Sequence, residues 1–234
     1  MTNNLSYVSD YYIMGFFSRM YEQRLENIVR RSDRSFPGHI ALIITESDLF
    51  EHGSTHRIID FIRWSQDYHV KIVTIFVSLI DFDPGITDTL YNKLKTQMIN
   101  TLKDINASID LYSINGERIN VKFCSTSDLH INISLGYSGK KELTRAFKDI
   151  MFKIESGKLK PEDIDETVIE KHLLIKYEPD LVIRSGGKRL ADFLIWQSVY
   201  SEIYFTDVSW INLRKLDFLR AIRDYQQRQR RFGK

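Results

Sequence analysis

Short apolar runs rich in β-branched residues constrain the fold of this chain more than any other feature. The predicted strands are HIALII (39–44), VKIVTIFV (70–77), INVKFC (119–124), HINISL (130–135), DLVIR (180–184) and EIYF (202–205). Several of them contain uninterrupted apolar stretches, which are typical of parallel strands buried on both faces. Segments with helical periodicity separate many of these runs. The sequence therefore predicts an α/β fold, a single domain with a mostly parallel central sheet flanked by helices.

Amphipathic segments give the expected helices. These cover Tyr11–Arg31, Lys140–Ile154, Leu190–Tyr200 and Leu213–Arg231, together with a stripe from Leu90 to Ile105. We expect residues 1–38 to form an N-terminal helical extension and residues 39–234 to form the domain. The first helix is interpreted as packing on its own domain or on a partner chain. Its aromatic front and basic back also allow an alternative, contact with anionic lipid.

Composition and charge exclude several function classes. The net charge of +2 does not favour a nucleic-acid binder. The 6 histidines lack metal-ligand spacing, so no zinc site is expected. The single cysteine, Cys124, excludes an intrachain disulfide and fits a reducing compartment. No apolar stretch approaches the ~20 residues of a membrane span. We expect a cytoplasmic protein, with peripheral membrane contact as the alternative.

Ligands of parallel sheets bind beyond the carboxyl ends of the strands, which directs attention to Thr45–Phe50, Ser78–Asp83 and Arg184–Arg189. The last segment reads Arg184-Ser185-Gly186-Gly187-Lys188-Arg189. Glycine N–H groups and forked guanidinium groups suit a diphosphate. A glycine turn with arginines in surface ion pairs explains the same residues equally well. Glu202 is either a solvated carboxylate or a Mg²⁺ ligand.

The segment from Asp180 to Lys234 resembles the cis-prenyltransferase family, the undecaprenyl diphosphate synthase-like proteins. The similarity rests on IRSGG, Arg189, DFLIWQ, YSEIYFTDVSW and RRFGK. It implies elongation of an allylic diphosphate by isopentenyl diphosphate, dependence on Mg²⁺, and a dimer. The diphosphate-binding residues that it implies are Arg184, Ser185, Gly186, Gly187, Arg189, Arg231 and Gly233. The tail residues Arg231 and Gly233 would complete the isopentenyl site of the partner chain.

The first strand departs from the family pattern. The family opens its site with H-x-A-x-I-M-D-G-N-G-R-W, where this chain has HIALIITESDLF. The family's essential aspartate is replaced by Thr45, its two glycines by Glu46 and Asp48, and its arginine by Leu49. Two acids beside a diphosphate should weaken allylic binding by charge repulsion.

This pattern of retained tail and lost aspartate resembles the non-catalytic Nogo-B receptor-like subunits. Our leading interpretation is an accessory chain without a catalytic residue of its own. It would form a heterodimer or heterotetramer with a catalytic cis-prenyltransferase subunit and supply the Arg-x-Gly tail. The first alternative is a self-sufficient homodimeric prenyltransferase, with Glu46 or Asp48 as Mg²⁺ ligand and altered acceptor or regiochemistry. The second is a module that binds isoprenoid diphosphates without turnover.

Overall fold

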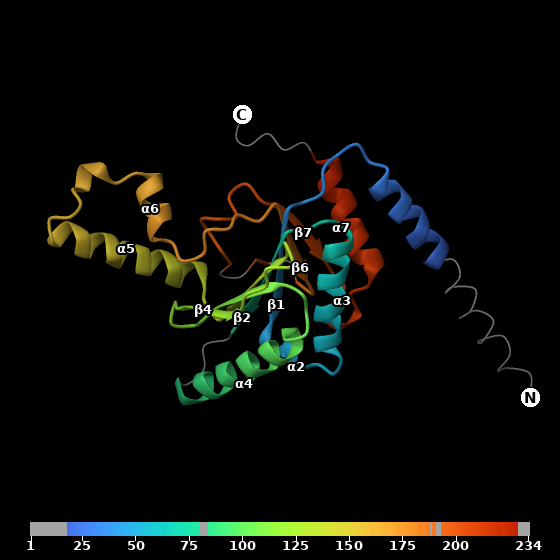
Figure 1. Cartoon of the computed structure of the whole chain (residues 1–234), viewed down its shortest axis with the longest axis horizontal. Helices are drawn as coiled ribbons and strands as arrows, with labels where there is room; N and C mark the ends of the chain where they lie inside the picture. The colour runs from blue at the N-terminus through green and yellow to red at the C-terminus, as the bar shows by residue number, and fades with distance from the viewer. Residues whose placement is uncertain (1–17, 80–83, 188, 191–192, 229–234) are drawn as a thin grey trace, which may run out of the picture.

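A computed structural model describes residues 18–79, 84–187, 189–190 and 193–228 of the chain (Figure 1). Its centre is a seven-stranded sheet in the order β4-β3-β5-β2-β1-β6-β7. All neighbouring strands are parallel except β3 and β4. The predicted α/β fold is therefore confirmed. The strands are β1 (His39–Thr45), β2 (Ile72–Ser78), β3 (Ser108–Tyr112), β4 (Arg118–Lys122), β5 (His130–Leu135), β6 (Leu181–Ser185) and β7 (Glu202–Thr206).

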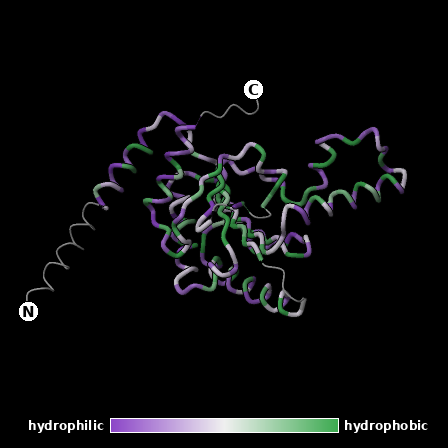
Figure 2. The backbone as a smooth tube through the Cα atoms, turned by 180° about the vertical axis from the view of Figure 1, so that it is seen from behind, coloured by the Kyte–Doolittle hydropathy of each residue, from purple (hydrophilic) through white to green (hydrophobic). Residues whose placement is uncertain are grey.

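Helices pack on the sheet, and two further helices form an arm. The helices are α2 (Glu46–Phe50), α3 (Ser54–Asp67), α4 (Pro84–Leu102), α5 (Gly139–Glu155), α6 (Glu166–His172) and α7 (Lys215–Gln227), with 3-10 turns at Pro161–Asp163 and Trp210–Asn212. Residues 18–30 are also helical. Helices α5 and α6 extend away from the body of the molecule as an arm, which both views show (Figures 1 and 2).

The larger core lies between one face of the sheet and helices α3, α4 and α7. Ile40, Leu42 and Ile44 point to this face, whereas Ala41 and Ile43 point to a smaller core on the other face. This alternation is the period of two that a strand imposes. Both sets are fully buried, which explains why the first strand is apolar from Ile40 to Ile44. Each such aliphatic side chain contributes about 1.5–3 kcal/mol on burial.

The described part of the N-terminal helix packs on the domain itself. Leu25 and Val29 are buried in the larger core, and Glu26 forms an ion pair with Lys215 at 3.1 Å. Residues 1–17, which include the start of this predicted helix, lie outside the described residues. No described helix has the length and apolarity to cross a membrane.

Three sequence expectations need correction. Residues 195–200 form turns instead of the predicted helix. Phe193 and Leu194 are buried in the smaller core, and the side chain of Gln197 bonds the Ile175 carbonyl at 2.7 Å, so tertiary contacts override helix propensity. Strand β3 had not been predicted. The short helix α2, which follows the first strand, had not been predicted either.

Candidate functional site

The carboxyl ends of β2, β1 and β6 lie side by side at one edge of the sheet. Thr45 pairs with Ser78, and Ile43 pairs with Arg184. The parallel pairing therefore brings Thr45–Phe50 and the Arg184 turn together, as the sequence predicted. The third predicted segment, Ser78–Asp83, is described only to residue 79.

The turn from β1 into α2 is held by Thr45 and Asp48. Thr45 is the N-cap, and its hydroxyl accepts from the Asp48 N–H at 3.3 Å. Oδ2 of Asp48 in return accepts from the Thr45 N–H at 2.7 Å and from its hydroxyl at 2.8 Å. This reciprocal arrangement is a capping box. One carboxylate oxygen of Asp48 is therefore engaged in holding the local backbone.

Glu46 occupies the first turn of the same helix and is only 6% exposed. Its Oε2 atom has no hydrogen-bond partner among the described residues. A carboxylate oxygen buried without a partner is costly, because it loses its hydration. Glu46 is thus the least satisfied acid at this edge.

Arg184 places a guanidinium group at the end of β6. Its Nη1 donates to the Ile43 carbonyl at 3.1 Å, while its buried Nε has no partner within the described residues. Burial lowers the pKa of Arg184, and the carboxylate of Asp48 opposes this shift. An arginine keeps its charge even so. Arg184 therefore offers a partly desolvated cation with an unused N–H donor.

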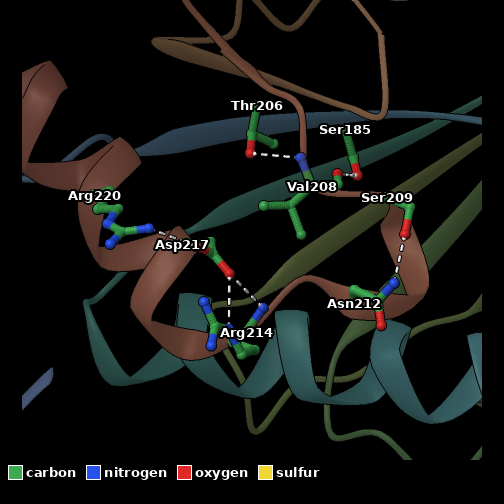
Figure 3. A network of polar contacts seen from close by, with 8 residues as sticks. All are labelled: Ser185, Thr206, Val208, Ser209, Asn212, Arg214, Asp217 and Arg220. Carbon is green, nitrogen blue, oxygen red and sulfur yellow. Dashed lines mark hydrogen bonds and ion pairs between the residues drawn. The ribbon is translucent and has the colours of Figure 1, made fainter. Parts of the chain in front are cut away.

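Within the Gly-Gly turn, Ser185 and Gly186 hold the backbone by hydrogen bonds, whereas Gly187 lies against the guanidinium of Arg184. Gly186 has φ +67°, which favours glycine, and its N–H donates to the carbonyls of Thr206 and Val208. The hydroxyl of Ser185 donates to the Val208 carbonyl at 2.8 Å (Figure 3). The sequence analysis expected both residues to bind a diphosphate. The Gly186 N–H and the Ser185 hydroxyl instead donate to carbonyls of the protein and hold the turn.

Gly187 is the residue of this turn that lies against the arginine. A Cβ atom at Gly187 would lie 3.3 Å from both Nε and Nη2 of Arg184. The missing side chain therefore leaves room beside the guanidinium. Arg189 is exposed. Lys188, Arg231 and Gly233 lie outside the described residues.

The segment after β7 is hydrogen-bonded to this turn and is held by contacts of its own (Figure 3). The Val208 N–H donates to Thr206 Oγ1 at 3.2 Å, and Asn212 donates to Ser209 Oγ at 2.8 Å. Farther on, the buried Asp217 accepts from the N–H of Arg214 and from Arg220 at 3.1 and 3.0 Å. The loop that supports the Gly-Gly turn is thus fixed to the start of α7.

Glu202 lies away from this edge. It begins β7 opposite Leu181, whereas Ser185 pairs with Thr206 at the other end. A five-residue strand is about 13 Å long from first to last residue. Within one chain, the structure therefore does not bring Glu202 together with Arg184. Its carboxylate instead accepts from Arg228 at 2.8 Å.

Sequence reasoning missed two groups of residues. One is Arg228; the signal was available in its spacing from Asp224, four residues earlier on a helix. The other is Glu142 in α5, a buried carboxylate that accepts from the N–H groups of Leu174 and Ile175 and from Gln197. Burial raises the pKa of Glu142. No local sequence signal identifies this second group, because its partners are distant in the chain.

The comparisons with known proteins agree with one another. Residues 82–233 match the family model described as "Putative undecaprenyl diphosphate synthase". The tritrans,polycis-undecaprenyl-diphosphate synthase (geranylgeranyl-diphosphate specific) of Methanocaldococcus jannaschii is 33% identical, over 92% of this chain and 89% of the relative. Isoprenyl transferase 1 of Corynebacterium efficiens is 34% identical, over 92% and 96%.

A solved structure shares the fold. Lavandulyl diphosphate synthase from Lavandula x intermedia, solved in complex with dimethylallyl diphosphate, superimposes with a TM-score of 0.66 at 23% identity. The match covers 85% of this chain and 99% of that one.

Proposed function

Because this chain belongs to the undecaprenyl diphosphate synthase-like family of cis-prenyltransferases, we propose that it acts in the condensation of isopentenyl diphosphate with an allylic prenyl diphosphate. The product would be a longer polyprenyl diphosphate. The observation that carries the proposal is Arg184 at the carboxyl edge, with an unused donor and a glycine turn beside it. The names of the relatives, which are synthases and transferases, support a chain that is itself the enzyme.

The described residues act on the diphosphate by binding and orienting it. Arg184 donates to the Ile43 carbonyl through one nitrogen, which fixes the plane of its guanidinium. Because its Nε is buried, the guanidinium would meet phosphate oxygens through its remaining terminal N–H groups, which keep the directions of a planar fork. Arg189 adds a second, exposed cation. Because Arg184 is partly desolvated, its attraction for an anion is stronger than that of an exposed arginine.

Mg²⁺ fits this edge only as an ion held mainly by substrate. Within the described ranges no group of three or more His, Cys, Asp and Glu side chains is placed to hold a metal. Mg²⁺ is commonly bound by one or two carboxylates together with substrate phosphates. Glu46, with its orphaned Oε2, and the second oxygen of Asp48 are the candidates. When bound, the ion would neutralise charge on the departing diphosphate.

A second candidate, the accessory subunit, is favoured by the geometry of Thr45. This residue carries no carboxylate at the family's aspartate position, and its hydroxyl and N–H are used in the cap of α2. The capping box also engages Oδ2 of Asp48, the nearest replacement acid. In this alternative, the chain would bind a catalytic cis-prenyltransferase subunit and lend it the tail residues Arg231 and Gly233.

A labelled-isopentenyl elongation assay with Mg²⁺ and an allylic primer tests both candidates. The protein alone is compared with the protein co-purified with a relative that has the intact D-G-N-G-R-W loop. Product from this chain alone, lost in Glu46→Gln or Asp48→Asn, supports the self-sufficient enzyme. Product only from the pair, above that of the relative alone, supports the accessory subunit. Product from neither would contradict the proposed function.

Binding of inorganic pyrophosphate separates a loss of binding from a loss of turnover. At a ligand concentration of ~100 Kd, binding stabilises the native state by about 2.7 kcal/mol, which raises Tm by roughly 5–10 °C for a chain of this size. We expect this shift to disappear in Arg184→Gln. It should persist in Arg63→Gln, which removes an exposed arginine from α3. A full Tm shift in Arg184→Gln would show that Arg184 does not bind pyrophosphate. A full Tm shift in the wild type, without product from the chain alone or from the pair, would indicate the binding module as the function.

A further inference from the structure

A pocket of about 470 Å³ lies between the first half of α5 and the turn that joins β3 to β4. This volume is in the range of small-molecule sites. Its lining carries four cations, Lys140, Lys141, Arg145 and Lys148, against one acid, Asp149. The proposed function uses none of these residues. The charge of the pocket therefore indicates an anionic ligand of its own.

The cations form a row along one side of α5. Lys141, Arg145 and Lys148 follow one another at intervals of four and three residues, which places them on one face of a helix. Lys141 and Lys148 are exposed, and neither has a carboxylate partner among the residues that the structure describes. With a rise of roughly 1.5 Å per residue, these two lysines are about 10 Å apart along the helix axis. A ligand that meets the whole row must carry negative charge over a similar length.

The wall of the pocket beside Arg145 is tightly packed. Nη1 of Arg145 donates to the Gly116 carbonyl in the turn between β3 and β4. Gly116 has φ +76°, and a Cβ atom there would lie 3.0 Å from Cε2 of Tyr137 and 3.1 Å from Nη1 of Arg145. The turn, the aromatic ring and the guanidinium are thus in close contact. The fold therefore sets the direction of Arg145, in contrast to the exposed lysines.

Tyr137 adds a hydrogen-bond donor without an acceptor. Its side chain lines the pocket and is 2% exposed, and its hydroxyl has no hydrogen-bond partner within the described ranges. Burial raises the pKa of Tyr137 to about 12, so the hydroxyl keeps its proton at neutral pH. The neighbouring Arg145 has donors only and cannot accept this proton. A buried donor left unpaired is costly, and an oxygen atom of a ligand would satisfy it.

This pocket is separate from the arginine turn. Arg184, Ile43, Phe76 and Ser134 pair in one row across β6, β1, β2 and β5. Neighbouring strands are roughly 4.8 Å apart, so the strand that leads into α5 lies about 14 Å from Arg184. A diphosphate bound at Arg184 would therefore leave this pocket open.

We propose that the pocket binds a linear chain of three or more phosphate groups, either as free polyphosphate or as part of a nucleotide. Such a chain can contact Lys141, Arg145 and Lys148 together. A single diphosphate meets only part of the row, and water and salt screen its attraction to exposed lysines. Thr144 and Asn115 add neutral donors to the lining. The inference goes beyond the proposed function, which places one diphosphate at Arg184.

Isothermal titration calorimetry with inorganic tripolyphosphate, without Mg²⁺, tests the pocket. The parent is full-length Arg184→Gln, in which the diphosphate site does not contribute. We expect one tripolyphosphate per chain, and pyrophosphate to bind at least about tenfold more weakly because it makes fewer charged contacts. Lys141→Gln/Lys148→Gln should raise the Kd for tripolyphosphate at least about tenfold for the same reason.

The matched control is Lys153→Gln/Lys158→Gln, which removes the same charge from exposed positions outside the pocket. Its Kd should equal that of the parent. An equal loss of affinity in both lysine pairs would reduce the effect to net charge and overturn the assignment. No binding of tripolyphosphate to the parent would overturn it as well.

Tyr137→Phe tests the hydroxyl, since it keeps the ring and removes only the donor. We expect the Kd for tripolyphosphate to rise roughly tenfold, because a hydrogen bond to a charged oxygen is lost. An unchanged Kd would leave only surface lysines and refute the built pocket. ATP identifies the source of the phosphates: affinity equal to that of tripolyphosphate supports a nucleotide, and weaker affinity supports free polyphosphate. No reading depends on elongation, so failure of the proposed function would leave this result unaffected.

Discussion

At the scale of single residues, His39 shows how a buried titratable group is kept neutral. Its Nδ1 donates to the Glu178 carbonyl and its Nε2 accepts from the Thr74 hydroxyl, both at 2.8 Å. Both ring nitrogens therefore have partners in the neutral tautomer. The side chain is 4% exposed, and burial lowers the pKa of His39 to about 4. Protonation would convert the acceptor nitrogen into a donor facing a hydroxyl.

This arrangement predicts a loss of stability in mild acid. The pKa of His39 is lower in the folded than in the unfolded state, so the stabilisation is complete above about pH 6.5 and declines as the pH falls towards 4. By pH 5 the wild type should lose about 2 kcal/mol of unfolding free energy through this residue. We expect the pH dependence between 7 and 5 to shrink by that amount in His39→Gln. Denaturant unfolding at both pH values measures it.

The matched control is His56→Gln, which removes an exposed histidine from α3. Its pH dependence should equal that of the wild type. A wild-type slope in His39→Gln would show that another group is responsible.

At the scale of elements, the start of α5 is packed against the segment that follows the Gly-Gly turn. A Cβ atom at Gly139 would lie 2.6 Å from the Phe193 carbonyl oxygen and 2.9 Å from the Ile195 nitrogen. Both are backbone atoms, which cannot rotate away. The Glu142–Gln197 hydrogen bond of 2.9 Å holds the same two segments together. The arm thereby supports residues 193–197, which follow the Gly-Gly turn along the chain.

We expect Gly139→Ala to lower the unfolding free energy by about 1–3 kcal/mol, because overpacking must displace one of two backbones. Gly85→Ala is the matched control: it lies in α4, and its added Cβ meets nothing within 4 Å. That change should be neutral or slightly stabilising, since alanine favours a helix. Thermal and denaturant unfolding compare the pair. Equal stabilities would mean that the 193–195 segment moves aside freely.

At the scale of the whole molecule, the N-terminal helix and the α/β domain share one core. Leu25 is 1% exposed within the larger core, and the side-chain amide of Gln226 in α7 donates to the Val29 carbonyl. Although residues 1–38 read as an extension in the sequence, their described part packs beside α7 and adds Leu25 and Val29 to the larger core. The helix should therefore unfold together with the domain.

Leu25→Ala is expected to destabilise the whole molecule by about 2–5 kcal/mol in a single cooperative transition. Ile28→Ala, on the same helix but 47% exposed, should cost less than 1 kcal/mol. Circular dichroism and intrinsic fluorescence should report coincident transitions in both variants. A separate, earlier transition for the helix in Leu25→Ala would show that it is an independent unit.

The sequence alone determined the features that depend on local pattern. Largely apolar runs identified β1, β2, β5 and β6, because a strand buried on both faces carries apolar residues at most of its positions. Ligands of parallel sheets bind beyond the carboxyl ends of the strands, and this rule needs only the strand direction. It therefore predicted that Thr45 and Arg184 lie at the same edge of the sheet. The family followed from a motif run between Asp180 and Lys234 that is contiguous in the chain.

Only the tertiary structure decided how the polar groups are used. Asp48 caps its own helix, Gly186 and Ser185 bond the segment after β7, and Glu202 holds Arg228. Residues 195–200 of the predicted helix form turns, because the neighbouring Phe193 and Leu194 enter the smaller core. In most of these cases the partner lies far away in the sequence. A residue's type limits which bonds it can make, but the fold determines which partner comes within 3 Å of it.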